Sequence, residues 1–255
     1  MSEYKIEAGT AQHVGNRPAQ HDRVALYTSA RAPGYVLAVL ADGGERNALG
    51  ADQALHTAKQ LFDEYRPGDA PSLERIAALL REIAQETHDV LLMNPLAASA
   101  EARSTLVLLV LTPQHQAVWA TVGDSRLYRF ANGACVERSS DAAYIDHLVS
   151  VDKLPLEAAR KHRGSRLLAN VVGNALKAPF VTGGSREGLQ AGDAFLLCSD
   201  GLWAWFSDNE LAAAVARRRP REAAELLIDK ARERAAGNGD NCSMAIVRLV
   251  ARAPA

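Results

Sequence analysis

The sequence predicts an α+β fold in which two packed antiparallel sheets are flanked by helix pairs, a four-layer αββα sandwich. Runs of strand character occur in groups and do not alternate singly with helices, which favours α+β over a parallel α/β sheet. Two pairs of helical patterns separate these groups, near residues 50–95 and 207–236. The chain has 255 residues and neither an internal repeat nor a linker. We therefore expect one domain spanning residues 1–255.

The N-terminal part is expected to supply three strands followed by two helices. Continuous or alternating apolar residues predict strands at 4–11, 24–28 and 35–40. From Gly50 the apolar residues recur at helical spacing as far as Pro67-Gly68, which ends the helix. A second helix is expected to begin near Ser72 and to fade near Pro95.

The C-terminal part begins with four strands in quick succession, at 104–112, 117–121, 126–130 and 135–138. Tight breaks between them predict an antiparallel meander. Residues 141–188 form an irregular insert with short helical fragments and no strong strand pattern. A buried strand then leads into Ser199-Asp200-Gly201, a capping box at 207–210 opens a helix, and Pro220 suits the start of the next. The last strand is expected at 244–249.

Composition indicates a globular protein without a nucleic-acid or membrane partner. Hydrophobic residues make up 48% and charged residues 23% of the chain, and the net charge is -1. The longest aliphatic run, 106–111, is too short to span a bilayer, and the first residues lack a signal-peptide pattern. Three widely spaced cysteines in strand-like contexts indicate buried, reduced thiols. These features predict a cytoplasmic location.

Aspartates recur where the predicted strands end. Asp42-Gly43 and Asp200-Gly201 each follow an apolar strand, while Asp124 and Asp240 each follow a glycine near a strand boundary. A hairpin turn would explain Asp-Gly only if another strand followed at once, and neither pair shows one. Several carboxylates around one core, with a glycine carbonyl among them, suit hard divalent cations. No Cys/His spacing offers a zinc or copper site, so Mg²⁺ or Mn²⁺ is expected.

Seven segments, in order along the chain, carry a recognisable set of motifs. They are Arg17-Pro-Ala-Gln-His-Asp22, 39–50 with Asp42-Gly43, Ser104-Thr105-Leu106, Val122-Gly-Asp-Ser-Arg126, 162–173, Leu197-Cys-Ser-Asp-Gly-Leu202, and Asp240-Asn241. Together they resemble the type 2C metal-dependent protein serine/threonine phosphatases, the PPM family, in its bacterial single-domain form. The resemblance implies an αββα sandwich with the metals in a cleft at one end of the sheets.

The resemblance also implies a ligand set for two Mn²⁺ or Mg²⁺ ions. Asp42 would bridge both ions, and the Gly43 carbonyl would bind the second. Asp200 and Asp240 would complete the first ion's protein ligands. Asp22 would act at the second ion, largely through water.

Two further residues complete the implied site. Asp124, together with Asp200, matches the position of a weaker third ion. Arg17 would hold the substrate phosphate, for which the planar guanidinium fork is suited. The catalytic set implied by the family is therefore Arg17, Asp42 and Asp200, and Asn241 is interpreted as an orienting group.

The implied activity is hydrolysis of phosphoserine and phosphothreonine by direct attack of a water activated at a dinuclear metal centre. The expected partners are phosphorylated proteins that are substrates of a serine/threonine kinase, and the chain is expected to be a monomer. Two alternatives stay open: a phosphatase-like binding or scaffold protein, and a hydrolase of small phosphoesters. The first is motivated by the loop 44–47 and by Arg103, where the family usually has glycines.

Three details of the chain depart from the family pattern or offer another chemistry. His21, next to Asp22, could serve as a ligand or an acid, although lone histidines are more often structural. The flap insert, about 141–188, matches the family in position but poorly in residues. Cys242 and Arg248 have the spacing of a cysteine-dependent phosphatase, but the residues between them are strand sequence. Because that chemistry needs a glycine-rich phosphate loop, Cys242 is interpreted as a core residue.

Overall fold

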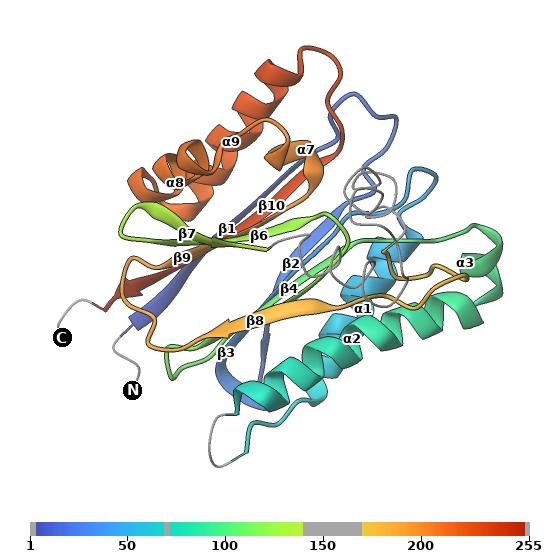
Figure 1. The fold of residues 1–255 in the computed structure, drawn as a ribbon, viewed down its shortest axis with the longest axis horizontal. Helices are drawn as coiled ribbons and strands as arrows, with labels where there is room; N and C mark the ends of the chain where they lie inside the picture. The colour runs from blue at the N-terminus through green and yellow to red at the C-terminus, as the bar shows by residue number, and fades with distance from the viewer. Residues whose placement is uncertain (1–3, 69–71, 140–169, 253–255) are drawn as a thin grey trace, which may run out of the picture.

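The structure, a computed structural model, describes residues 4–68, 72–139 and 170–252. These residues form four layers: two five-stranded antiparallel sheets pack face to face, and helices cover both outer faces (Figure 1). The predicted αββα sandwich is confirmed. Within the described residues, no helix is both long and apolar enough to cross a membrane.

The first sheet brings the two ends of the chain together. Its strands, in spatial order, are β1 (Tyr4–His13), β10 (Cys242–Ala251), β9 (Ala194–Cys198), β6 (Arg126–Ala131) and β7 (Ala134–Arg138). β1 and β10 pair along their whole length, from Tyr4 opposite Ala251 to His13 opposite Cys242. The C-terminal strand therefore lies inside this sheet, between β1 and β9.

The second sheet is built mainly from the middle of the chain. Its order is β2 (Arg23–Ser29), β3 (Ala32–Ala41), β4 (Leu106–Leu111), β5 (Ala117–Val122) and β8 (Thr182–Arg186). Every residue of β4 and β5 is buried, as the continuous apolar sequences predict for strands covered on both faces.

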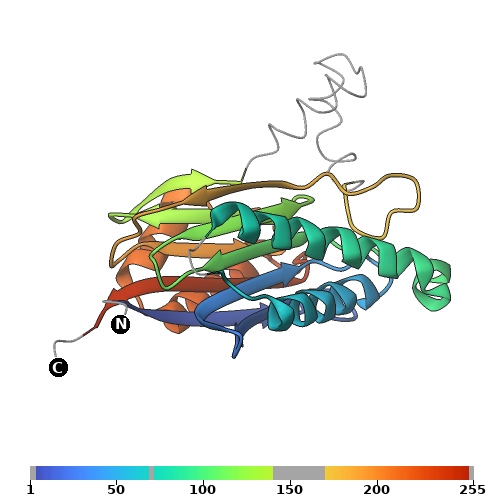
Figure 2. The ribbon, with the colours of Figure 1, turned by 90° about the horizontal axis from the view of Figure 1, so that it is seen from below.

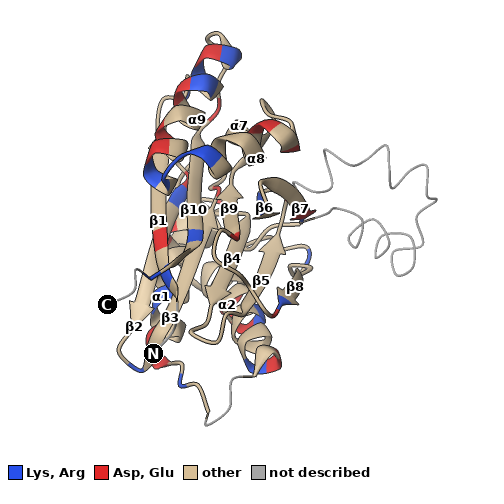
Figure 3. Cartoon of the chain, turned by 90° about the vertical axis from the view of Figure 1, so that its left-hand side faces the viewer, with Lys and Arg blue, Asp and Glu red and all other residues tan. Residues whose placement is uncertain are grey.

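Two groups of helices cover the outer faces of the sheets. Helices α1 (Leu49–Glu64), α2 (Leu73–Met93) and α3 (Pro95–Ser99) belong to the second sheet's side, and α7 (Asp200–Trp203), α8 (Asp208–Arg217) and α9 (Pro220–Ala235) to the first sheet's side. Figure 2 shows α2 lying along the outer face of its sheet. Charged residues of both signs occur along α9 (Figure 3), as expected for an outer helix with a solvent face.

Three apolar layers hold the sandwich together, and β4 contributes to two of them. Leu106 and Leu108 pack toward the helices, with Phe62 of α1 in the same layer. Val107 and Leu109 point to the other side and join the layer between the sheets. Successive strand residues face opposite sides of a sheet, so the unbroken apolar run serves both layers.

The structure contradicts the predicted meander. β4 pairs with β5 and β6 pairs with β7, but β5 and β6 lie in different sheets and pair with β8 and β9. The chain passes between the sheets at Gly123, whose φ of +95° is accessible mainly to glycine. A short break rich in turn residues looks the same in sequence whether it closes a hairpin or changes sheets.

Two elements were absent from the sequence prediction. β8, Thr-Gly-Gly-Ser-Arg, lies inside the segment expected to lack a strand, and has no apolar side chain to reveal it. Gly184 lies directly against the ring of Trp119 on β5, which leaves no room for a larger residue. α3 begins at Pro95, where the preceding helix was expected to fade, because the Asn94 side chain caps it. The predictions for residues 141–169 lie outside the described residues.

Candidate metal centre

The five predicted aspartates lie at one end of the two sheets. Asp22 precedes β2 and Asp42 follows β3, and these strand ends are neighbours because Arg23 pairs with Ala41. Asp200 follows β9 and Asp240 precedes β10, whose residue Met244 pairs with Cys198. Asp124 lies just before β6, and Arg126 of β6 also pairs with Cys198. Antiparallel pairing thus gathers residues that are far apart in the sequence.

Hydroxyl groups fix the backbone beside Asp42. The Asp42 N–H donates to Thr105 Oγ1 (3.1 Å), and the Thr105 N–H donates to the Asp42 carbonyl (2.9 Å). Ser104 Oγ donates to the same carbonyl (2.9 Å). Thr105 Oγ1 also bonds Ser125 Oγ (2.8 Å), which ties the Asp42 loop to the residue after Asp124. Ser104 and Thr105, which belong to one of the seven motif segments, therefore fix the backbone of Asp42 and connect it to the residue after Asp124.

Asp22 is fully buried, and one of its oxygens has no partner. Ser199 Oγ donates to Asp22 Oδ2 (2.8 Å) and itself accepts from the Ser243 N–H (3.0 Å). Asp22 Oδ1, in contrast, accepts from no N–H or hydroxyl group among the described residues, and the Asp22 carboxyl lies against the carboxyl of Asp42. A buried carboxylate oxygen without a partner is costly, so this atom marks a place where a cation would stabilise the protein. Sequence reasoning missed Ser199 and Ser243, although Ser199 stands directly beside Asp200.

The carboxylates raise one another's pKa values. Burial, followed by the charges of Asp124, Asp240 and Asp22, raises the pKa of Asp200 to about 7. Burial is also the main cause of the higher pKa of Asp42, and Asp22 is the largest charge acting on it. Removing water from like charges disfavours their ionised forms, and a divalent cation among them would reverse the effect.

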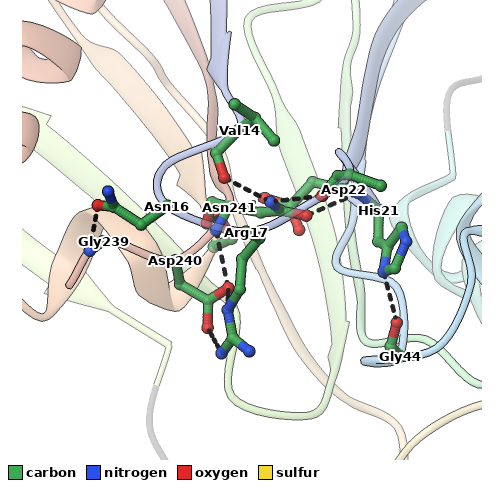
Figure 4. A network of polar contacts seen from close by, with 11 residues as sticks. Val14, Asn16, Arg17, His21, Asp22, Gly44, Gly239, Asp240 and Asn241 are labelled. Carbon is green, nitrogen blue, oxygen red and sulfur yellow. Dashed lines mark hydrogen bonds and ion pairs between the residues drawn. The ribbon is translucent and has the colours of Figure 1, made fainter. Parts of the chain in front are cut away.

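Arg17 and Asp240 form a bidentate ion pair. Arg17 Nε donates to Asp240 Oδ1 (2.7 Å), and Arg17 Nη2 donates to Oδ2 (2.6 Å) (Figure 4). The side chains are 49% and 39% exposed, so water reaches both partners. The predicted phosphate-binding residue thus contacts a predicted metal ligand.

Asn241 holds the loop that carries Arg17. Its Nδ2 donates to the carbonyls of Val14 (2.8 Å) and Ala19 (3.0 Å), and its Oδ1 accepts from the His21 N–H (2.6 Å) (Figure 4). These contacts support the orienting role predicted for Asn241. The His21 ring uses Nδ1 to contact the Gly44 carbonyl (3.0 Å). Since a carbonyl only accepts, Nδ1 carries the proton, and His21 links two loops of the site.

The donor chemistry of the site fits a hard divalent cation. The candidate side chains are all carboxylates, the oxygen ligands that Mg²⁺ and Mn²⁺ prefer. Among residues 4–68, 72–139 and 170–252, however, no three His, Cys, Asp or Glu side chains are grouped as they would be around an ion. Both oxygens of Asp240 are bonded to Arg17. Arg17 therefore competes with an ion for the oxygens of Asp240.

Cys242 does not belong to the site's reactive groups. It begins β10, is 3% exposed, and burial raises its pKa to about 12, so it is a neutral thiol at physiological pH. Arg248 lies on the same strand, about 20 Å away at the usual rise per residue, and could not share a phosphate with it. The interpretation of Cys242 as a core residue is confirmed.

A family model described as protein phosphatase 2C matches residues 8–225. The chain belongs to the protein phosphatase 2C family. The serine/threonine protein phosphatase PstP of Mycobacterium tuberculosis is 28% identical to this phosphatase 2C chain over 227 residues, which is 88% of the chain. The chain spans only 41% of that relative's length. The serine/threonine phosphatase stp of Listeria monocytogenes is 26% identical over 214 residues, 83% of each protein.

The fold of this phosphatase 2C chain is also that of solved family structures. The catalytic domain of PstP, crystallised in complex with two manganese ions, has a TM-score of 0.66 and 24% identity. The match covers 96% of this chain and 98% of that domain. At this identity the comparison establishes the shared fold.

Proposed function

We propose that this chain is a metal-dependent phosphatase that removes phosphate from phosphoserine and phosphothreonine in proteins. The observation that carries the proposal is the unpaired, buried Oδ1 of Asp22 within a group of mutually repelling carboxylates. Membership of the protein phosphatase 2C family and the names of the relatives support the substrate class. The proposed catalytic domain is residues 1–255.

The residues proposed to hold two Mn²⁺ or Mg²⁺ ions are Asp42, the Gly43 carbonyl, Asp200 and Asp240, with Asp22 acting at the second ion. Asp124 and Asp200 are proposed for a weaker third ion. The structure of the related PstP domain with two manganese ions supports this number. When bound, such a pair lowers the pKa of water and withdraws charge from a phosphoryl group.

The chain's own residues contribute position and charge. Arg17, which is half exposed beside Asp240, would bind two oxygens of the substrate phosphate through its planar fork. A water attacks phosphorus in line, the P–O bond to the serine or threonine oxygen breaks, and free phosphate and the hydroxyl side chain result. Neither Ser199 nor Cys242 is available as a nucleophile, because the first is bonded within the Asp22 network and the second is a neutral core thiol.

We propose that the substrates are phosphoproteins made by a serine/threonine kinase, so that the enzyme reverses the kinase's action. A cytoplasmic, monomeric enzyme is part of the same proposal. Hydrolysis of small phosphoesters would use the same residues, and a phosphopeptide panel compared with p-nitrophenyl phosphate would rank the two substrate classes.

The deciding experiment is hydrolysis of p-nitrophenyl phosphate and a phosphothreonine peptide with Mn²⁺, and again after EDTA. We expect activity that depends on Mn²⁺ and is nearly abolished in Asp42→Asn and Asp200→Asn, with unchanged circular dichroism. Asp63→Asn, which removes an exposed carboxylate on α1, is the matched control and should keep full activity.

Two outcomes would contradict the proposal. Full activity in EDTA would exclude the metal mechanism. A folded protein with no hydrolysis at any Mn²⁺ concentration would favour the scaffold alternative.

A further inference from the structure

Both oxygens of the Asp240 carboxylate accept hydrogen bonds from the chain itself. Oδ1 accepts from Arg17 Nε (2.7 Å) and from the Asn241 N–H (2.8 Å), and Oδ2 accepts from Arg17 Nη2 (2.6 Å). The hydrogen bonds to Asp240 are also the main reason why the pKa of Arg17 is raised. The lone pairs of Oδ1 are both used and one of the two on Oδ2 is used, so a cation that binds Oδ1 or both oxygens together must compete with Arg17.

The two loops that carry this pair are joined along their length. The Asn16 N–H donates to the Gly239 carbonyl (2.8 Å), and the Gly239 N–H donates to Asn16 Oδ1 (3.0 Å). Gly15 has a φ of +66°, and a Cβ there would lie 2.2 Å from the Asp240 carbonyl oxygen. The backbones of the two loops therefore stay together. As a result, Arg17 is held beside Asp240 and loses little conformational entropy when it pairs with the carboxylate.

The side chain of Arg17 is nevertheless free to leave. It is 49% exposed, and such an ion pair is weak because water and salt screen it. The guanidinium fork that binds the Asp240 carboxylate also suits a phosphate. One side chain thus has two anionic partners, one within the protein and one on the proposed substrate.

We propose that Arg17 controls access of the divalent cation to Asp240: its guanidinium competes with the cation for the carboxylate oxygens, and cation binding displaces it toward the substrate phosphate. This inference rests on the proposed function. It adds that the ion-binding and phosphate-binding steps are coupled through one residue. Because coupling is reciprocal, phosphate that captures Arg17 should strengthen cation binding, and the bound cation should strengthen phosphate binding.

The test is a calorimetric titration of the full chain with Mn²⁺ in the absence of substrate. Arg17→Ala should bind Mn²⁺ about fivefold more tightly than the wild type, which corresponds to about 1 kcal/mol. Arg17→Lys, which keeps the charge but loses the fork, should fall between them. Inorganic phosphate should tighten Mn²⁺ binding more in the wild type than in Arg17→Ala.

Arg46→Ala is the matched control for loss of a positive charge near the site. Arg46 is exposed and pairs with Glu101, which is not a candidate ligand (3.3 Å). Its replacement should change Mn²⁺ affinity less than Arg17→Ala does. If Mn²⁺ affinity rises equally in Arg46→Ala and Arg17→Ala, the effect comes from the loss of any nearby positive charge, and the proposal is overturned.

The remaining outcomes separate this inference from the proposed function. Weaker or unchanged Mn²⁺ affinity in Arg17→Ala, with normal binding by the wild type, would refute the access role alone. Binding by Arg17→Ala but not by the wild type would support it in its strongest form. If neither protein binds Mn²⁺ and both are folded by circular dichroism, the metal-dependent function itself fails together with this inference.

Discussion

Two adjacent glycines provide a matched pair for testing the loop after β3. A Cβ at Gly43 would lie 2.5 Å from the His21 carbonyl oxygen, whereas one at Gly44 would meet nothing closer than the Arg103 carbonyl oxygen at 3.6 Å. Ordinary contact begins at 3.4 Å, so Gly43→Ala requires a shift of about 0.9 Å (3.4 minus 2.5) between two backbone segments. Gly44→Ala requires none.

The expected magnitudes follow from this geometry. Overpacking at Gly43 should cost about 1–3 kcal/mol, which lowers Tm by about 2–12 °C for a chain of this size. Gly44→Ala should be neutral, or stabilise by up to about 1 kcal/mol, because alanine restricts the unfolded chain. Since the Gly43 carbonyl is a proposed ligand, a shift of this size should also lower kcat for p-nitrophenyl phosphate at least tenfold, with kcat unchanged in Gly44→Ala.

Thermal unfolding followed by circular dichroism and Mn²⁺-dependent hydrolysis measure the two effects on the same samples. Loss of activity without loss of stability in Gly43→Ala would place the effect at the site alone. The reasoning is refuted if the two variants behave alike, or if Gly44→Ala is the more damaging change.

Three other predictions concern residues near the site and at a helix end. In Asn241→Ala the free energy of unfolding in urea should fall by about 2–4 kcal/mol, because three hydrogen bonds that hold the Arg17 loop disappear. Most of kcat/KM should be lost for the same reason, and an unchanged kcat/KM would contradict this. Cys242→Ser should keep its turnover, and the native thiol, with a pKa of about 12, should resist iodoacetamide at pH 8. The pKa of Glu210 is lowered from 4.5 to about 2, chiefly by Arg234. The stability it contributes is therefore present above pH 4.5 and lost toward pH 2, so the Tm difference between wild type and Glu210→Gln should shrink as pH falls from 7 to 3.

The strands with apolar sequences were readily predicted because each is buried on at least one face. The fully buried β9 ends at Cys198, two residues before Asp200, which is the first residue of α7. β8 escaped prediction because its two glycines fit closely against β5 and Trp119, and so its sequence lacks the usual strand signal. The sequence also does not show which strands pair with each other, because the break at Gly123 does not reveal that β5 and β6 belong to different sheets.

The candidate ligands were predicted from Asp-Gly and Gly-Asp pairs at strand ends, but their surroundings were not. The Ser199 and Ser243 groups that fix Asp22 are ordinary serines in sequence, and only the β9–β10 pairing brings them together. The same holds for Arg17 and Asp240, which lie 223 positions apart. Motifs specify which residue types are present, whereas the pairing of these residues depends on the three-dimensional arrangement.

The position of β10 has a consequence for synthesis of the protein on the ribosome. β10 is the last of the described strands to be made, yet it lies between β1 and β9, and β1 pairs with no other strand among the described residues. During translation β1 must wait for more than two hundred residues before its ten-residue ladder can form. Asp240 and Asn241, which belong to the proposed metal centre, are made at the same late stage. A growing chain therefore cannot complete the proposed metal centre before residue 240 is made, and stopping translation earlier should yield a product with an unpaired β1 and no Mn²⁺-dependent hydrolysis.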